Sequence, residues 1–344
     1  MNEPIVTIVV PCYNEEEILP YTFSELKRLM QDMIDDGSIS PNSKILCVDD
    51  GSKDRTWQLI YKETLKNELV KGLKLSGNVG HQNALLAGLF TAKSMSDCIV
   101  SIDADLQDDI EIIKEFVNKY KQGYEIVYGV RGKRATDTFF KRTTAQGFYK
   151  MMKAMGVNLV YNHADFRLMS KRAVEELEGF EESNMFLRGI VPLIGFRSTK
   201  AYYERKERIA GETKYPLKKM LSFAFDGITS FSIKPIRFVL FMGLASFFGS
   251  LVFALYFLSL KFFGNTELGW TSLITSIWLI GGLQLIAVGL VGEYIGKIYK
   301  EVKRRPKYIV DIDTFNLPIP LYFKESDINH ESFTVDHRKV SESN

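Results

Sequence analysis

The stretch CIVSIDADLQD, residues 98–108, decides how this chain should fold. It begins with the short apolar run 98–102, which is typical of a buried strand. The run ends at Asp103 and Asp105, two carboxylates separated by a single residue. Carboxylates spaced in this way just beyond a strand can face one divalent cation, and the amide of Gln107 can supply a further oxygen. Hard oxygen ligands suit Mg²⁺ or Mn²⁺, so the stretch predicts a metal site at the end of a buried strand.

Apolar runs and helical patterns alternate on both sides of this stretch. Strands separated by helices are joined by right-handed crossovers, which place helices on both faces of a mainly parallel sheet. The fold class predicted for this part of the chain is therefore α/β. The predicted strands span residues 5–10, 44–48, 73–75, 98–102 and 126–128, and the predicted helices span residues 15–35, 57–69, 83–94 and 110–121.

Polar residues gather where four of these strands end. Because ligands bind beyond the carboxyl ends of parallel strands, the segments that follow the strands are candidates for a binding site. They read PCYNEE at 11–16, DDGSKD at 49–54, NVGHQ at 78–82 and DADLQD at 103–108. Any one of them could be a turn or a helix cap, but together they predict a ligand site at one edge of the sheet.

Two common nucleotide-binding loops do not occur in the sequence. A GxxxxGK[ST] loop is missing, which argues against a P-loop kinase, and no GxGxxG follows the first strand, which argues against a dinucleotide-binding dehydrogenase. The net charge is only +2, and we expect no nucleic-acid partner.

The cysteines and the N-terminus indicate a cytosolic location for the α/β part. Cys12, Cys47 and Cys98 lie in apolar runs without metal-ligand spacing, which favours buried thiols in a reducing compartment. The first residues, MNEPIVTIVV, lack the basic leader and the long apolar run of a secretory signal. We therefore expect this part of the chain to stay in the cytosol.

The later part of the chain contains two long uncharged runs. Residues 238–260 and 268–292 comprise 23 and 25 residues without a charge, and a helix needs about 20 to cross a bilayer. Only residues 261–267 separate them, so they predict a transmembrane hairpin. The positive-inside rule places both outer flanks in the cytosol, because the flanks are basic and the loop has one lysine. The flanking basic residues are Lys234, Arg237, Lys297, Lys300, Lys303, Arg304, Arg305 and Lys307.

Residues 215–233 predict a different kind of membrane contact. Apolar side chains recur there at helical spacing with lysines between them, a pattern typical of a helix lying in the membrane interface. The cationic segment 205–214 leads directly into it and suits an anionic lipid head group. After Pro306 the chain turns polar, and we expect a loosely ordered extension.

These segments resemble, in order, the motifs of the polyprenyl-phosphate glycosyltransferases. That group belongs to the inverting family-2 glycosyltransferases, which have the GT-A fold for nucleotide-sugars. The bactoprenol glucosyltransferase branch is the more similar, and dolichol-phosphate mannose synthase is more distant. The matching stretches, from about residue 5 to about residue 310, are VVPCYNEE, VDDGSKDRT, NVGHQNALLAGL, SIDADLQD, YGVRGKR, ADFRLMS, AGETKYPL and EYIGKIYKEVKRRPKY.

The resemblance implies four parts and a membrane location. Residues 1–210 would form a cytosolic GT-A catalytic domain, and residues 211–235 would form the interfacial amphipathic helix. Residues 236–296 would form a hairpin of two transmembrane helices, and residues 297–344 a cytosolic basic segment with a polar tail. The protein would then be a two-span protein of the bacterial cell membrane, and it could form homo-oligomers.

The resemblance also implies a role for each matching residue. Asp105 and Asp165 would be catalytic. Asp165 occupies the position proposed for a base, but a role in orienting the acceptor or an arginine is an equally good interpretation. Asp50 would read the uracil edge of the donor. The residues implied to hold the donor nucleotide are Pro11, Tyr13, Glu15, Asp50 and Asp103, and those implied to hold Mg²⁺ or Mn²⁺ are Asp103, Asp105 and Gln107. The residues expected to bind acceptor or phosphate are Arg131, Arg142, Arg188, Arg205, Arg208 and Lys214.

The implied reaction transfers a hexose or an N-acetylhexosamine from a UDP-sugar to undecaprenyl phosphate, with inversion at the anomeric carbon. The acceptor phosphate is already anionic at neutral pH, because the second pKa of a phosphate monoester is about 6, so it needs little deprotonation. The product would be a lipid-phosphate monosaccharide for glycosylation of cell-envelope polymers such as teichoic acid. A flippase and an external glycosyltransferase would then have to act on it.

Two other functions fit part of the pattern. A processive membrane polysaccharide synthase is the main alternative, but it normally needs a QxxRW-type motif and more spans than the sequence predicts. A membrane scaffold with a decayed transferase domain is the other, and the acids at every strand end argue against it.

Overall fold

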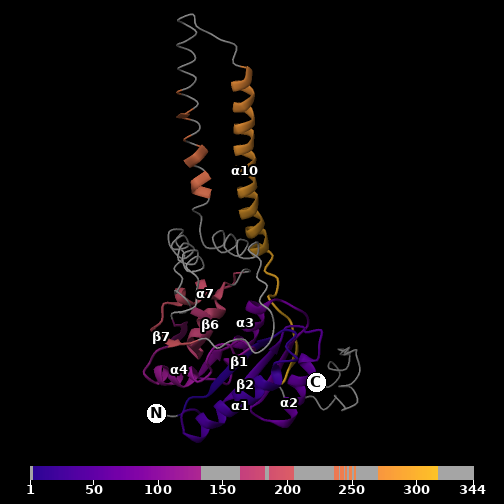
Figure 1. Ribbon diagram of the computed structural model, residues 1–344, viewed down its shortest axis with the longest axis vertical. Helices are drawn as coiled ribbons and strands as arrows, with labels where there is room; N and C mark the ends of the chain where they lie inside the picture. Colours follow the sequence, from indigo (N-terminus) through magenta and orange to yellow (C-terminus); the bar gives the residue numbers. More distant parts are fainter. Residues whose placement is uncertain are drawn as a thin grey trace, which may run out of the picture.

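An eight-stranded sheet with helices on both faces forms the body of the molecule (Figure 1). The computed structural model describes residues 3–132, 163–182, 186–204 and 270–316, together with short stretches between 236 and 252. The strands are β1 (Val6–Cys12), β2 (Lys44–Asp49), β3 (Val70–Leu75), β4 (Cys98–Ser101), β5 (Ile126–Arg131), β6 (His163–Ser170), β7 (Ser198–Tyr203) and β8 (Val310–Asp313). The helices are α1 (Leu19–Asp35), α2 (Thr56–Lys66), α3 (His81–Ala92), α4 (Ile112–Lys121), α6 (Lys171–Glu178), α7 (Leu187–Ile190), the 3-10 turn η1 (Val191–Ile194) and α10 (Trp270–Val302).

The strand order across the sheet is β7-β5-β6-β4-β1-β2-β3-β8. Parallel pairs join β1 to β2, β1 to β4, β2 to β3 and β5 to β7. Antiparallel pairs join β3 to β8, β4 to β6 and β5 to β6. The prediction of an α/β fold with a mainly parallel sheet is therefore confirmed.

Both faces of the central strand β1 are buried. Ile8 and Val10 pack on one side against α1, α2 and α4, and Val9 packs on the other side against α3. A strand buried on both faces is apolar throughout instead of alternating, which explains the unbroken run that marked it in the sequence. Gly88 lets α3 approach closely, since a Cβ there would lie 2.3 Å from Val9 Cγ1.

The first part of the tail after Pro306, residues 307–316, differs from the loosely ordered extension that we expected. Residues 310–313 form β8, which pairs with β3 at one edge of the sheet. The hydroxyl of Thr314 donates to the carbonyl of Gly72 at 2.9 Å and accepts from its N–H at 2.8 Å. Ile312 and Phe315 are buried. These contacts are long-range, so the polar composition of the tail could not reveal them.

Helix α10 extends away from the α/β body (Figure 1). It is 33 residues long and exposes large apolar side chains such as Ile277, Leu285 and Val291. Within the described part of the chain, no helix meets the combined length and apolarity required to cross a membrane. The predicted interfacial helix, 211–235, lies outside the described residues, as does most of the first predicted span, 238–260.

Candidate functional site

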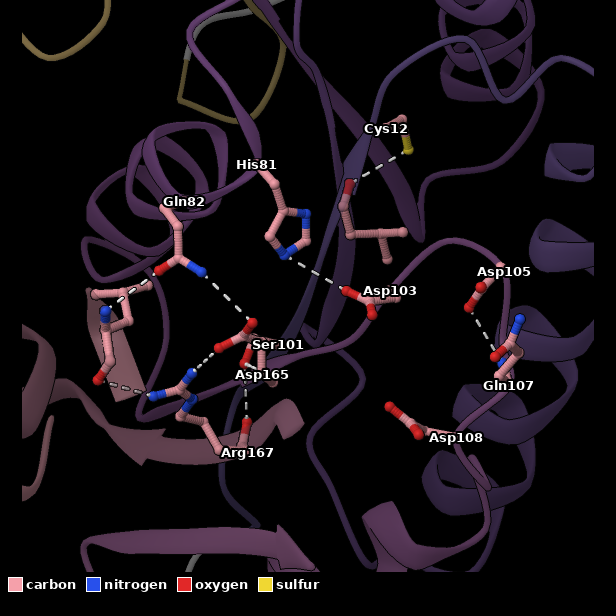
Figure 2. Close-up of polar contacts among 12 residues, drawn as sticks. Cys12, His81, Gln82, Ser101, Asp103, Asp105, Gln107, Asp108, Asp165 and Arg167 are labelled. Carbon is pink, nitrogen blue, oxygen red and sulfur yellow. Dashed lines mark hydrogen bonds and ion pairs between the residues drawn. The ribbon is translucent and has the colours of Figure 1, made fainter. Parts of the chain in front are cut away.

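The polar segments predicted to form a site do gather at one edge of the sheet. Because β1 is parallel to both β2 and β4, the carboxyl ends of these strands meet there, and the register pairs Cys12 with Asp49. The close-up view shows side chains from the end of β4, from β6 and from the start of α3 facing a common space (Figure 2). His81 points toward Asp103, and Gln82 points toward Asp165.

The loops that follow β1 and β2 are tied together through backbone N–H groups. The N–H of Asn14 donates to the Ser52 hydroxyl at 3.0 Å, and the N–H of Glu15 donates to the Thr56 hydroxyl at 2.8 Å. Asn14 has a left-handed backbone with φ 55°. Helix α1 begins at Leu19 instead of the predicted residue 15, because Pro20 is tolerated in the first turn of a helix but not in its interior. Pro11 is buried at the end of β1, whereas Tyr13 is 43% exposed at the rim of the site.

Asp50 is buried and holds the segment that follows β3. Its two carboxylate oxygens accept from the N–H groups of Val79 and Gly80 at 2.7 and 3.0 Å. Burial raises the pKa of Asp50, and these backbone hydrogen bonds work in the opposite direction. Gly51 has a φ of +64°, and a Cβ there would lie 2.5 Å from the backbone of Gly77. A carboxylate can accept about four hydrogen bonds, so the predicted contact with the uracil edge is still open to Asp50 and stays a prediction.

Asp103 lies at the centre of the acidic part of the site. Its Oδ1 is 3.5 Å from Nε2 of His81. Burial is the main cause that raises the pKa of Asp103; the carboxylates of Asp165, Asp108 and Asp105 add to it, and His81 opposes it. Asp105 accepts from the N–H of Gln107 at 3.3 Å, in a turn where Leu106 has a left-handed φ of 43°.

These residues suit a metal ion that is shared with a substrate. Among the described residues, no three His, Cys, Asp or Glu side chains converge on a point that could hold a metal. Mg²⁺ is usually bound by only one or two carboxylates, with water and substrate phosphates completing the shell. Asp103 and Asp105 supply two such carboxylates, and a cation beside them would relieve the repulsion between the acids around Asp103. The donor set therefore fits Mg²⁺ or Mn²⁺ held together with a diphosphate.

Arg131 is paired with a buried carboxylate at the end of β5. Its Nε donates to Oδ1 of Asp108 at 3.2 Å, and Asp108 is 3% exposed. Burial alone would lower the pKa of Arg131, but Asp108 and Tyr203 raise it. The Arg131 side chain remains 25% exposed, so Asp108 anchors it while leaving part of it within reach of the site.

Asp165 is the most heavily engaged acid of the site. Its Oδ1 accepts from Nη2 of Arg167 at 2.5 Å, and its Oδ2 accepts from Nη2 of Arg188 at 3.1 Å. Burial by itself would raise the pKa of Asp165, but the guanidinium groups of Arg188 and Arg167 outweigh it and hold that pKa well below its ordinary value. Asp165 therefore stays ionised at neutral pH.

Several residues of the site were not predicted as such. Arg167 is two positions from Asp165 on β6, and residues at that spacing share one face of a strand, so the ADFRLMS stretch held a usable signal. Gln82 and Asp108 lay inside motifs already singled out, but only their contacts distinguish them from ordinary turn residues. The predicted phosphate-binding residues Arg142, Arg205, Arg208 and Lys214 lie outside the described residues.

Half of the chain matches the model of a known protein family. Residues 7–178 match the model of glycosyl transferase family 2. The uncharacterized glycosyltransferase YkoT of Bacillus subtilis (strain 168) is 61% identical over 92% of this chain and 94% of that protein. The bactoprenol glucosyl transferase of Shigella phage SfII is 38% identical over 89% of this chain and 97% of that protein.

Solved structures also resemble the chain, at lower similarity. The mannosyltransferase PcManGT from Pyrobaculum calidifontis, solved in complex with GDP-Man and Mn²⁺, is 15% identical with a TM-score of 0.45. The match covers 88% of this chain and 88% of that one. The nucleotide-sugar and the metal are ligands of that protein.

Proposed function

Because this chain belongs to glycosyl transferase family 2, we propose that it moves a hexose or an N-acetylhexosamine from a UDP-sugar to undecaprenyl phosphate. The contacts made by the first turn of α3 are the main support for this proposal. His81 lies 3.5 Å from Asp103, on the side predicted to hold the donor diphosphate. The next residue, Gln82, donates to Asp165 at 3.4 Å, beside the arginine predicted to bind the acceptor. One helical turn thus joins the two halves that a transfer between phosphorylated molecules needs.

The donor half would be built from the loops after β1, β2 and β4. Pro11, Tyr13 and Glu15 would line the nucleotide, and Asp50 would reach the uracil edge with the lone pairs that the backbone does not use. Asp103, Asp105 and Gln107 would hold the metal. When bound, Mg²⁺ or Mn²⁺ would neutralise the charge that develops on the departing diphosphate.

The acceptor half would use cationic side chains. Arginine binds phosphate through a fork of N–H groups, and Arg131 and Arg188 are the described candidates. In-line attack by the lipid phosphate on the anomeric carbon would break the bond from the sugar to the nucleotide diphosphate and invert the centre, so an α-linked donor would give a β-linked product. The printed name of the phage relative, a bactoprenol glucosyl transferase, supports a lipid carrier as acceptor.

A membrane location follows from this acceptor. The uncharged runs 238–260 and 268–292 would form two spans, residues 211–235 would lie in the interface, and the domain of residues 1–210 would stay in the cytosol of a bacterium. The exposed apolar side chains of α10, such as Ile277 and Leu285, support this placement. A flippase and an external glycosyltransferase would then act on the product.

The proposal is tested with the full chain in membranes, radiolabelled UDP-glucose, UDP-N-acetylglucosamine or UDP-galactose, and undecaprenyl phosphate. We expect label that is extractable into organic solvent and labile to mild acid, and the sugar that gives the most label identifies the donor. Water-insoluble polymer would indicate a processive synthase instead. No label from any donor would contradict the proposal.

A further inference from the structure

A buried polar cluster fixes the backbone next to Arg188. The N–H of Leu187 donates to Oε1 of Gln82 at 3.2 Å, and the carbonyl of Leu187 accepts from Nη1 of Arg167 at 3.4 Å. Leu187 is 1% exposed and Arg167 is 2% exposed. Both polar groups of the Leu187 residue are therefore held by side chains from other elements, Gln82 from α3 and Arg167 from β6.

The same two side chains meet at Asp165. Gln82 donates to Oδ2 of Asp165 at 3.4 Å, and Arg167 donates to Oδ1 at 2.5 Å. Arg188 adds Nε to Oδ1 at 3.4 Å and Nη2 to Oδ2 at 3.1 Å. These four contacts match the roughly four lone-pair sites of a carboxylate. An acid whose oxygens are all engaged by donors, two of them arginines, has little capacity to accept a proton from a substrate.

Arg188 differs from the rest of the cluster because its side chain is 41% exposed. Arg167 and Asp165 are buried behind it, while α7, which carries Arg188, is only four residues long. So short a helix cannot by itself hold a long side chain in one direction. The direction of Arg188 is set by Asp165 through its guanidinium and by Gln82 and Arg167 through the backbone of Leu187.

We propose that Gln82, Asp165 and Arg167 form a positioning frame that aims Arg188 at the phosphate of the acceptor, and that Asp165 acts as a permanent anion in this frame instead of as a general base. The inference rests on the proposed function, in which Arg188 binds the acceptor phosphate. It assigns positioning roles to Gln82 and Arg167, and it decides between the two roles that were open for Asp165. The lowered pKa of Asp165 agrees with it, and so does an acceptor that is already anionic.

A double-mutant cycle with the full chain tests the frame, because it measures whether two residues act through one another. The variants are Gln82→Met, Asp165→Asn and Arg188→Ala, and each of the first two combined with Arg188→Ala. Methionine keeps the length of Gln82 and removes its hydrogen bonds. Gln31→Met is the matched control, since Gln31 also donates to an aspartate, Asp35, at 2.8 Å, but on the exposed face of α1.

We expect Gln82→Met to raise KM for undecaprenyl phosphate about tenfold, because a tenfold change corresponds to the loss of roughly one charge-assisted hydrogen bond. KM for the UDP-sugar should change less than about twofold. In the Arg188→Ala background neither Gln82→Met nor Asp165→Asn should have a further effect above about twofold. Gln31→Met should match the wild type in both parameters. A purely structural loss would instead lower the active fraction and leave both KM values unchanged.

Two outcomes would overturn the frame. If Asp165→Asn lowers kcat equally with and without Arg188, then Asp165 acts as a base and not through the arginine. If Gln82→Met has the same KM for undecaprenyl phosphate as Gln31→Met, then Gln82 does not position Arg188. This comparison tests the frame even if Asp165→Asn fails to fold. An inactive wild type would refute the proposed function separately, and equilibrium binding of undecaprenyl phosphate in detergent to the same variants would still test the frame.

Discussion

Asp105 is the single residue on which the proposed chemistry most depends. It supplies one of the two neighbouring carboxylates proposed to hold the metal, and it accepts a local hydrogen bond from the N–H of Gln107. We expect Asp105→Ala to lower sugar transfer at least about 100-fold, as loss of an electrostatic stabiliser does, at temperatures where the variant is still folded. Radiolabel transfer measures the activity, and thermal unfolding measures the temperature range in which the variant is folded.

The control for this substitution is Asp32→Ala, which removes an exposed carboxylate of α1 that pairs with Arg28 on the surface. It should leave transfer unchanged. Full activity of Asp105→Ala, or of the wild type in excess EDTA, would contradict the metal role.

Asp165 makes stability depend on pH in a defined direction. Its folded pKa lies below its ordinary value because Arg188 and Arg167 outweigh burial, so the unfolded chain takes up the proton first as the pH falls. Its contribution is therefore complete above the unfolded pKa of about 3.9 and declines as the pH falls toward the folded pKa. We expect the difference in free energy of unfolding between the wild type and Asp165→Asn to be constant from about pH 8 to about pH 5 and to shrink below about pH 4. Urea unfolding at stepped pH measures it, and a difference that shrank toward pH 8 would contradict the ion pairs.

At the scale of elements, the strands that escaped prediction, β6, β7 and β8, all contain charged residues. β6 carries Arg167, which is 2% exposed. A charged residue in the sequence favours a loop, and only the structure shows that Asp165 neutralises this buried charge. β8 is polar and four residues long, and it exists because β3 offers it an edge. The strands that were predicted, such as β1 and β4, are apolar on both faces and needed no partner to be recognised.

Thr314 tests how firmly β8 is joined to the sheet. Its hydroxyl is the described acceptor for the N–H of Gly72, so Thr314→Val leaves that buried donor without its partner at nearly constant shape. We expect a loss of about 1–3 kcal/mol in the free energy of unfolding, measured by urea denaturation. Thr64→Val is the matched control: the Thr64 hydroxyl, also buried, only donates to the carbonyl of Ile60 in its own helix. Equal losses in the two variants would show that the contact of β8 is not special.

At the scale of the whole molecule, the chain returns to the α/β body as β8 once α10 has ended (Figure 1). Residues 310–315 complete one edge of the sheet and part of its core, although they lie outside the range 1–210. Truncation before α10 would remove that edge together with the helix.

The proposed two-span anchor predicts how the chain behaves on extraction. Apolar segments of 23 and 25 residues should keep the protein in the membrane pellet after washing with alkaline carbonate, which strips proteins held only by surface charge, since about 20 residues suffice to span the hydrocarbon core. Immunoblots of pellet and supernatant measure this. Release of the full chain into the supernatant would contradict the anchor and leave only a peripheral association.

Much of the fold and half of the site could be read from local patterns. The strand and helix periods determined the α/β class, and the turn residues after Val10, Val48 and Ile102 marked the edge where the acids gather, because chain direction in a parallel sheet brings those ends together. The tertiary structure alone decided the rest. The family resemblance implied a base or an orienting group for Asp165 with equal weight, and only the contacts from α3, β6 and α7 show a carboxylate enclosed by donors. Periodicity reports which face of an element is buried, whereas the charge state of a buried acid depends on neighbours brought together from distant parts of the chain.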